Sequence, residues 1–170
     1  MRLVIASAWD GAAVGPDEYA TVDVTRSGAS VCVDVDAPFY DDPAPDAPPG
    51  PTPALWNFEV VELMLLGAGE KYLELEFGPH GHYLALQLAG RRAVQQSGME
   101  LSYRSDVRRG RFRAQASFPR IWLPMGCDRV NAFAMHGRGD ARRFLAYRGA
   151  PGTAPDFHRL ELFAPLSPLV

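Results

Sequence analysis

The segment 55–88, LWNFEVVELMLLGAGEKYLELEFGPHGHYLALQL, decides the fold that we expect for this chain. It contains three runs rich in β-forming residues, at 59–66, 72–77 and 83–88, and glycine-containing turns separate them. In the second run, tyrosine and glutamate alternate with leucine and phenylalanine. Alternation with a period of two is typical of a strand with one face in a hydrophobic core. The segment therefore predicts three antiparallel strands joined by two turns.

The connection at 67–71 sets the register between the first two predicted strands. It places Glu62 opposite Glu76 and Met64 opposite Glu74. One face of the pair then carries only apolar side chains: Val61, Leu63, Leu65, Leu73, Leu75 and Phe77. A shift by one residue would move every side chain of a strand to the other face, so this consistency supports the register.

The third predicted strand is expected to add its leucines to the same apolar face: Leu84, Leu86 and Leu88. This arrangement requires Leu84 to pair with Phe77, and it places Gln87 opposite Glu74. The opposite face of the ribbon then collects the polar side chains Glu62, Glu74, Glu76 and Gln87, with Met64 and Tyr72 at its edges.

This acidic face needs a compensating group, because like charges directly opposite each other destabilise a sheet by roughly 0.2–1 kcal/mol. We expect an arginine, either Arg113 or one from 138–148, since a guanidinium can meet two carboxylates at once. A calcium ion is the alternative, because calcium prefers oxygen ligands. A polyhydroxylated ligand is a third answer, and a simply solvated outer face is a fourth, since antiparallel sheets commonly expose one side.

The rest of the chain also predicts short strands separated by glycine and proline turns. We expect them at 2–9, 19–25, 31–35, 101–105, 112–118, 130–136, 144–147 and 159–163. No convincing amphipathic helix is present. The pattern and the length of 170 residues predict a single all-β domain, a two-sheet antiparallel β-sandwich spanning 1–170.

A proline-rich acidic segment at 38–54, PFYDDPAPDAPPGPTPA, interrupts this pattern. Proline removes a backbone donor, so the segment is expected to form a long surface loop and not a central strand. The loop leads directly to Trp56 and so brings an indole to the rim of the acidic face.

Composition excludes several classes of function. The net charge of −3 offers no electrostatic basis for binding nucleic acid. Cys32 and Cys127 alone provide neither a disulfide framework nor a zinc-binding spacing. No apolar run is long enough to span a membrane, and Asp10 interrupts the first apolar run before a signal peptide is complete. We therefore expect a cytoplasmic protein without a membrane partner.

Four segments carry a family resemblance: LWNFEVVE, YLELEFGPHGHYL, NAFAMHG at 131–137 and PDFHRLELFAPL at 155–166. In this order they resemble the uncharacterised UPF0462 family, typified by the vertebrate chromosome-four open-reading-frame-33 protein. More distantly, the chain is similar to family 9 carbohydrate-binding modules and DOMON-like domains. The resemblance implies a β-sandwich of carbohydrate-binding-module type, and it implies that Asn131, His136 and the run 157–159, which contains His158, border the acidic face.

These observations predict a non-catalytic module that binds a carbohydrate-like small molecule. Sugar hydroxyls pair with carboxylates and amides, which are supplied here by Glu62, Glu74, Glu76 and Gln87. The apolar face of a sugar stacks on aromatic rings, here those of Trp56 and Tyr72 with Phe39 or Tyr40. A glycosidase is disfavoured, because nothing in the sequence separates a general acid from a base among these glutamates.

Two other classes of function remain open. A DOMON-like haem binder could take axial ligands from Met64, Met135 and the four histidines. A protein-interaction domain without a small ligand could use the proline-rich loop and the arginine clusters. His80 and His82 could also hold a metal if the fold brings His136 or His158 to them, although a polar turn explains this pair more simply.

Overall fold

The structure, a computed structural model, describes residues 1–149 and 151–167 as strands, turns and short 3-10 helices. The strands are β1 (Arg2–Ile5), β2 (Ser7–Ala8), β3 (Ala20–Ser27), β4 (Ser30–Pro38), β5 (Gly50–Pro51), β6 (Val60–Leu66), β7 (Lys71–Phe77), β8 (His82–Ala89), β9 (Val94–Ser97), β10 (Ser102–Arg108), β11 (Arg111–Pro119), β12 (Arg129–His136), β13 (Arg143–Ala146) and β14 (Ala164–Pro165). The 3-10 helices are η1 (Pro16–Glu18), η2 (Leu55–Asn57), η3 (Ala68–Glu70), η4 (Arg120–Trp122), η5 (Gly139–Ala141) and η6 (Leu160–Leu162). None of these helices is long and apolar enough to cross a membrane.

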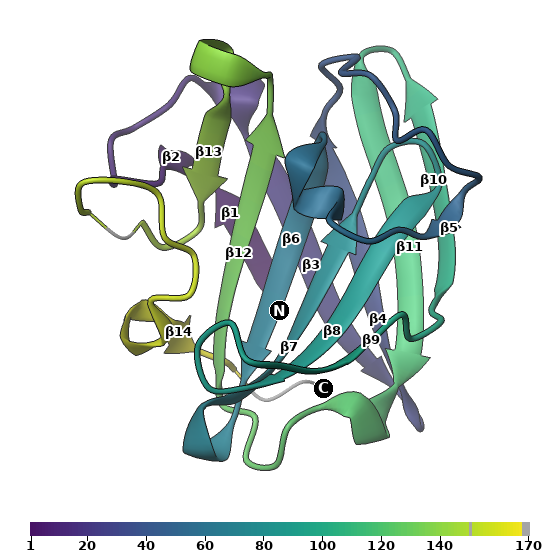
Figure 1. The fold of residues 1–170 in the computed structure, drawn as a ribbon, viewed down its shortest axis with the longest axis vertical. Coiled ribbons are helices and arrows are strands. Elements are labelled where there is room, and N and C mark those ends of the chain that lie inside the picture. The colour runs from purple at the N-terminus through teal and green to yellow at the C-terminus, as the bar shows by residue number, and fades with distance from the viewer. Residues whose placement is uncertain (150, 168–170) are drawn as a thin grey trace.

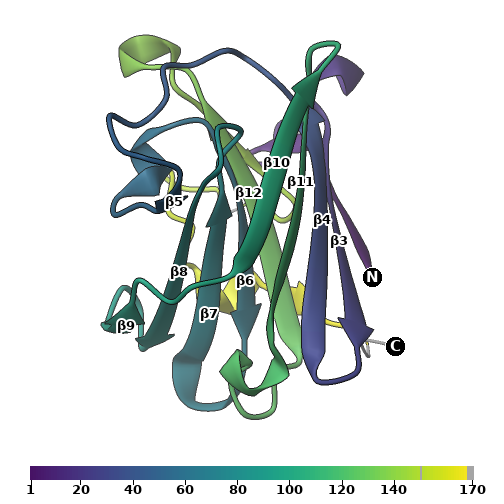
Figure 2. The ribbon, with the colours of Figure 1, turned by 90° about the vertical axis from the view of Figure 1, so that its right-hand side faces the viewer.

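The strands form two sheets that pack face to face (Figures 1 and 2). Sheet A has the order β1-β3-β4-β11-β10, and sheet B has the order β2-β13-β12-β6-β7-β8-β5. β14 pairs with β12 and β9 pairs with β8, at the margins of sheet B. All pairs are antiparallel except the short pair between β5 and β8. The expected two-sheet β-sandwich is confirmed.

The main core lies between the sheets. Alternate residues of each long strand supply it, among them Val22, Val33, Leu63, Leu75 and Phe112, each at most 1% exposed. The period-two patterns of β4 and β11 place their charged residues on the outer face of sheet A, where side chains are partly exposed. Sheet A is therefore amphipathic, as the sequence pattern predicts.

Sheet B is buried on both faces, and its outer face carries a second hydrophobic core. Every residue of β6 is buried, and so is every residue of β7 except Lys71. The second core includes Leu55, Met64, Tyr72, Leu84, Leu86, Leu88, Phe133, Met135, Leu160 and Phe163. The segments around η2 and η6 cover this face, since each contributes a fully or nearly fully buried leucine to it.

The predicted register between the first two ribbon strands is confirmed, with Glu62 opposite Glu76 and Met64 opposite Glu74. The predicted register of the third strand is wrong by one residue, because Leu84 pairs with Glu76 and Leu86 pairs with Glu74. The leucines of β8 therefore lie on the acidic face, and Tyr83 and Ala85 enter the main core instead. The prediction assumed one buried face, whereas the second core makes both faces suitable for leucine.

Two other expected strands differ in the structure. The segment 159–163 was expected to form a strand but forms η6, and a short strand follows it at β14. The segment 2–9 divides into β1 in sheet A and β2 in sheet B, so the chain crosses between sheets there.

The proline-rich loop 38–54 runs along the edge of sheet B, where β5 pairs with β8. The buried Glu59 carboxylate accepts hydrogen bonds from the backbone N–H groups of Tyr40 (2.9 Å) and Asp42 (3.2 Å). His82 Nε2 lies 2.9 Å from the carbonyl of Ala47. These contacts give the loop a defined path that ends at η2, beside the outer face of sheet B.

The corrected register has a direct test in Ala85→Glu. In the structure Ala85 is 0% exposed between the two sheets, so the substitution buries an unpaired charge and should cost about 3–5 kcal/mol of the free energy of unfolding. Urea unfolding measures this loss. Gln95→Glu on the exposed strand β9 is the control and should change stability by less than about 0.5 kcal/mol. A folded Ala85→Glu variant with parental stability would contradict this register and support the one expected from the sequence.

Candidate functional site

Three glutamates of the second core form a carboxyl cluster: Glu62, Glu74 and Glu76. Glu62 comes from β6, and the other two come from alternate positions of β7, so all three side chains lie on one face. One carboxylate oxygen from each lies within 4.8 Å of the others. The three residues are 3%, 4% and 0% exposed, respectively. The cross-strand register therefore concentrates three acids in a buried and largely apolar environment.

The carboxyl cluster forms no ion pair in the described part of the chain. Four of its oxygens are buried without a hydrogen-bond partner: Glu62 Oε1, Glu74 Oε2 and both oxygens of Glu76. None of the ion pairs among the described residues includes a member of the cluster. Burying an unpaired polar group is costly, so these oxygens need either protons or a ligand.

The expected neutralisation by Arg113 is wrong. Arg113 lies on β11 in sheet A, where its Nε donates to Asp36 at 2.9 Å on the outer face. The sequence showed the alternation of this strand but not the sheet to which it belongs. The arginines of 138–148 do not pair with the cluster either, and Arg142 is committed to backbone carbonyls.

Burial raises the pKa of all three carboxyl groups. The pKa of Glu74 rises to about 7, and the contact with the Glu76 carboxyl group, followed by the charge of Arg92, opposes this rise. Burial raises the pKa values of Glu62 and Glu76 well above the ordinary value, and the neighbouring carboxyl groups add to the effect. The cluster therefore retains protons at a pH where exposed glutamates have lost them.

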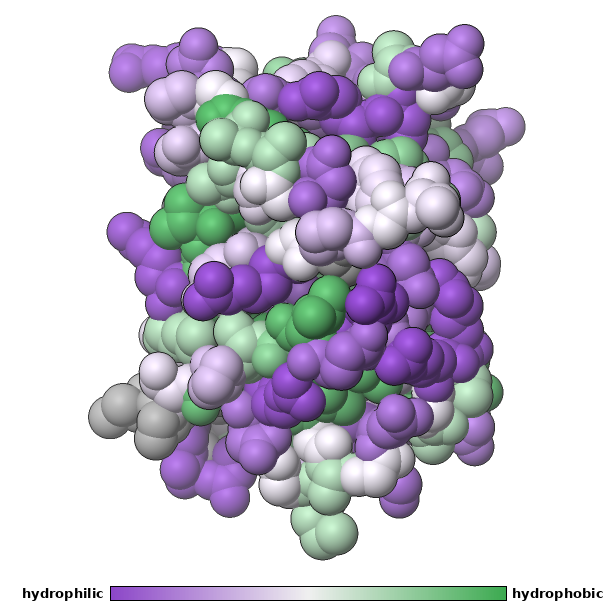
Figure 3. Space-filling model, turned by 90° about the vertical axis from the view of Figure 1, so that its left-hand side faces the viewer, coloured by the Kyte–Doolittle hydropathy of each residue, from purple (hydrophilic) through white to green (hydrophobic). Residues whose placement is uncertain are grey.

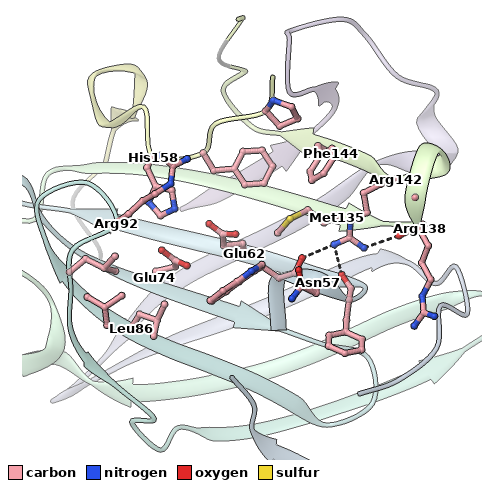
Figure 4. Close-up of a pocket in the computed structure, with 18 residues that line it drawn as sticks. Asn57, Glu62, Glu74, Leu86, Arg92, Met135, Arg138, Arg142, Phe144 and His158 are labelled. Carbon is pink, nitrogen blue, oxygen red and sulfur yellow. Dashed lines mark hydrogen bonds between the residues drawn. The ribbon is translucent and has the colours of Figure 1, made fainter. Parts of the chain in front are cut away.

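A cavity of about 990 Å³ opens above two members of the cluster, Glu62 and Glu74. Figure 4 shows both carboxyl groups in the space between His158 and Met135. The other lining residues, grouped by segment, are Trp56, Asn57 and Phe58; Leu86, Leu88, Arg92 and Val94; Gly137, Arg138, Gly139, Arg142 and Phe144; and Pro155 and Phe157. We call this space the acidic cavity. Glu76, which is 0% exposed, is not among the lining residues.

Arg142 holds one wall of the acidic cavity in place (Figure 4). Its guanidinium donates to the carbonyls of Trp56 (2.7 Å), Phe58 (2.8 Å) and Gly137 (2.9 Å). The bonds to Trp56 and Phe58 join the loop after β12 to the η2 segment, across 86 and 84 residues of the chain. The Trp56 side chain remains 44% exposed at the rim, as the sequence led us to expect.

Tyr72 and His158 form a second fixed element beside the cavity. The Tyr72 hydroxyl accepts a hydrogen bond from the backbone N–H of Arg92 (3.0 Å) and lies 2.7 Å from His158 Nδ1. The direction of this hydrogen bond depends on the tautomer of the imidazole: when Nδ1 accepts the Tyr72 hydroxyl proton, Nε2 carries the ring proton. Burial lowers the pKa of His158 to about 4, so this histidine is neutral at pH 7.

The remaining residues expected at the site lie elsewhere. Gln87 lies on the other face of β8, where its amide donates to the carbonyl of Trp122 at 3.3 Å. Asn131 is buried and bonds to both backbone groups of Arg148. His136 stacks on Tyr40 with 3.4 Å between ring centroids, away from the residues that line the cavity. Phe39 contacts His80. Gln87 and Asn131 therefore stabilise the fold through hydrogen bonds to backbone groups.

The residues considered for haem or histidine-bound metal are only partly brought together. Met135 and His158 line the acidic cavity, whereas Met64 is 0% exposed within the second core. Among the described residues, the carboxyl cluster is the one group of three or more ligand-type side chains close enough to share a metal ion. His80 and His82 of the GPHGH turn therefore have no third metal ligand close to them among the described residues.

Sequence reasoning missed Arg92, which lines the cavity together with Arg138 and Arg142. The run 138–148 was expected to supply an arginine to the acidic face, and Arg138 and Arg142 line the cavity without forming an ion pair with the carboxyl cluster. The cavity thus combines carboxyl groups at its floor, guanidinium groups at its walls and rim, and aromatic rings from Trp56 and Phe157. Such an arrangement can form hydrogen bonds with a polar ligand and stack on its apolar surface.

The raised pKa values predict an unusual dependence of stability on pH. A folded-state pKa above the unfolded value stabilises the protein fully below pH 4.5, and this stability is lost as the pH rises through the folded-state values. His158 acts only below its ordinary pKa of 6.5, and the Cys127 thiol, whose pKa burial raises from 9.0 to about 11, acts mainly above pH 8, so the lower half of the range from pH 7 to 9 isolates the glutamates. We expect the free energy of unfolding to fall across this range in metal-free buffer.

Glu76→Gln should flatten this slope by up to about 1.4 kcal/mol per pH unit, because one retained proton is removed. Urea unfolding at several pH values measures the slope. Glu100→Gln, the same change at an exposed position, should keep the parental slope. A parent whose stability is constant from pH 7 to 9 would show that the cluster is not protonated.

Comparisons with known proteins add the family and the fold. The chain is 38% identical to the UPF0462 protein C4orf33 homolog of Rattus norvegicus, over 98% of this chain and 88% of the relative. Identity to the human UPF0462 protein C4orf33 is 37%, over 96% of this chain and 86% of that protein. The Danio rerio homolog is 35% identical, with 96% and 87% covered. No family model matches the chain.

A solved structure from Bacteroides uniformis shares the fold, with a TM-score of 0.74 over 97% of this chain and 84% of that chain. It is described as a "putative carbohydrate-binding protein", and its sequence is 13% identical. This likeness supports the β-sandwich architecture. The near full-length identity to the vertebrate proteins, above one third, shows the relationship that the four sequence motifs indicated. The chain belongs to the UPF0462 family.

Proposed function

We propose that this protein is a non-catalytic binding module for a carbohydrate-like small molecule, which it holds in the acidic cavity. One observation carries the proposal: Glu62 and Glu74 each present a buried oxygen without a partner at the floor of the cavity. A folded protein rarely leaves such groups unsatisfied, and where it does, a functional reason is a common explanation.

The polar groups suit a ligand that has several hydroxyls. A carboxyl group accepts hydrogen bonds in either protonation state and also donates one when it is protonated. With a pKa of about 7, Glu74 can do both near neutral pH. The His158 Nε2–H group adds a neutral donor on the opposite wall. The cavity volume of about 990 Å³ lies within the range of small-molecule sites.

The aromatic groups suit the apolar face of a sugar ring. Trp56 exposes its indole at the rim, and Phe157 lines the wall opposite. Phe157 is held in place by stacking on Phe133, with 4.0 Å between ring centroids and 8° between planes. A preformed aromatic surface loses little conformational freedom on binding, which favours affinity. The shared fold with the Bacteroides uniformis protein supports the same class of ligand.

Hydrolysis of a glycoside is a less suitable function for these carboxyl groups. A retaining or inverting enzyme needs one ionised carboxylate beside one protonated acid. Here the same cause, burial, raises the pKa of all three groups, and no ion pair among the described residues keeps one of them ionised below neutral pH. We therefore infer that the cavity binds its ligand without hydrolysing it.

A protein-interaction domain without a small ligand is the second candidate. On the side of the molecule that carries β13, Figure 3 shows a largely hydrophilic surface with small, separate hydrophobic areas. Broad apolar patches mark many protein-binding surfaces, and this side offers none of that kind.

A haem binder would use Met135 or His158 in the same cavity, and an absorbance spectrum with added haemin tests for a Soret band.

The test is a glycan array of the parent protein, followed by calorimetric titration of the glycans that bind. Glu74→Gln should fold like the parent and bind at least about tenfold more weakly, because a charge-assisted hydrogen bond contributes about 1.5–3 kcal/mol. Trp56→Ala should also weaken binding, since it removes the stacking surface at the rim.

Two matched variants control for nonspecific effects. Glu100→Gln and Ile121→Ala make comparable changes at exposed positions outside the cavity, and both should bind like the parent. A parent that binds no glycan on the array, together with a Glu74→Gln variant of lower stability, would refute the carbohydrate proposal. That result would favour the protein-interaction domain.

A further inference from the structure

Glu76 needs an explanation that a ligand in the acidic cavity does not supply. Its side chain is 0% exposed, both of its carboxyl oxygens lack a hydrogen-bond partner outside the carboxyl cluster, and it does not line the cavity. A sugar hydroxyl that reaches Glu62 and Glu74 therefore does not reach Glu76. We propose that the carboxyl cluster of Glu62, Glu74 and Glu76 binds one calcium ion beneath the floor of the cavity.

The spacing of the three carboxyl groups suits an ion of this size. One oxygen from each glutamate lies within 4.8 Å of the others. Calcium binds oxygen at about 2.3–2.6 Å, so ligands on opposite sides of the ion are up to about 5 Å apart. Magnesium, at about 2.0–2.1 Å, demands closer and more regular ligands. The β6–β7 register holds the glutamates in this arrangement, because it pairs Glu62 directly with Glu76.

The chemistry of the cluster also selects a hard cation. All three ligands are carboxylates, and the described residues add no histidine or cysteine to the group. Oxygen ligands suit calcium and magnesium, whereas zinc and copper sites usually contain nitrogen or sulfur. A divalent ion would neutralise two of three carboxylate charges in a place where no arginine or lysine of the described chain forms an ion pair with them.

The ion would also connect the cluster to the cavity. Three carboxylates supply three to six oxygens, whereas calcium takes six to eight. Because Glu62 and Glu74 line the cavity, the open positions of the ion face it, and ligand hydroxyls can complete the coordination. This last step rests on the proposed function, but the binding of calcium itself does not.

The experiment measures calcium binding without any sugar. Protein purified in chelator is titrated with calcium chloride at pH 7.5 by calorimetry, and its unfolding midpoint is recorded with calcium and with chelator. We expect one calcium per chain. At a hundredfold excess of calcium over its Kd, the midpoint should rise by about 5 °C or more. Magnesium should give a smaller rise.

Glu76→Gln should lose this rise in midpoint and weaken calcium binding at least about tenfold, since one carboxylate ligand becomes a neutral amide. Glu62→Gln provides a second variant if the first does not fold, and Glu100→Gln should respond to calcium like the parent. Equal midpoints and no bound calcium in the parent would overturn the proposal. A rise in midpoint that persists in both cluster variants would also overturn it, because the calcium would then bind elsewhere.

Glycan binding is then compared with calcium and with chelator. Calcium binding without glycan binding would support the metal site and refute the sugar ligand. Glycan binding by a parent that binds no calcium would support the sugar ligand and refute the metal site. The two proposals therefore fail separately.

Discussion

Three carboxyl groups are buried on one face of sheet B without an ion pair among the described residues, and the rest of the cavity depends on this constraint. Antiparallel pairing of β6 with β7 makes this proximity unavoidable, because Glu62 lies directly opposite Glu76 and Glu74 is two residues from it. Burial then raises the pKa of each group. Such an arrangement opposes folding unless protons or a bound group compensate for it.

The charged side chains on the outer faces of the two sheets differ in exposure and in pairing. On the outer face of sheet A, Arg113 pairs with Asp36 and Arg2 pairs with Asp23, and these side chains are partly exposed. Those pairs contribute little to stability, but they leave no charge unsatisfied. On sheet B the acids are buried and lack such pairs, and a cavity opens above them. The charges of sheet A therefore face solvent, whereas two of the acids of sheet B line a cavity.

The cavity exists because two distant segments cover the outer face of sheet B incompletely. The η2 segment and the segment that leads to η6 each place a buried leucine, Leu55 and Leu160, in the second core. Arg142 ties the first segment to the loop after β12 through three carbonyl groups. Tyr72 fixes His158, which belongs to the second segment. Arg142 therefore holds one part of the wall, and Tyr72 of β7, a strand that also supplies the floor, holds another, which favours a preformed site.

The sequence by itself determined the elements and the β6–β7 register. Period-two alternation and a five-residue turn leave one pairing in which Leu63 and Leu75 share an apolar face, so the proximity of Glu62 and Glu76 follows from local information. The sequence also indicated the sandwich and the position of Trp56 at the rim, since short strands and a proline-rich loop are local features.

Only the tertiary structure decided which faces are buried and which strands are neighbours. The leucines of β8 satisfy either core equally well, so the register of that strand depended on the segments that cover sheet B from far along the chain. Arg113 does not lie near the carboxyl cluster, because β11 pairs with β4 in sheet A. Alternation within a strand does not indicate to which sheet the strand belongs. Arg142 and His158 entered the cavity through long-range contacts, which depend on how the whole chain packs.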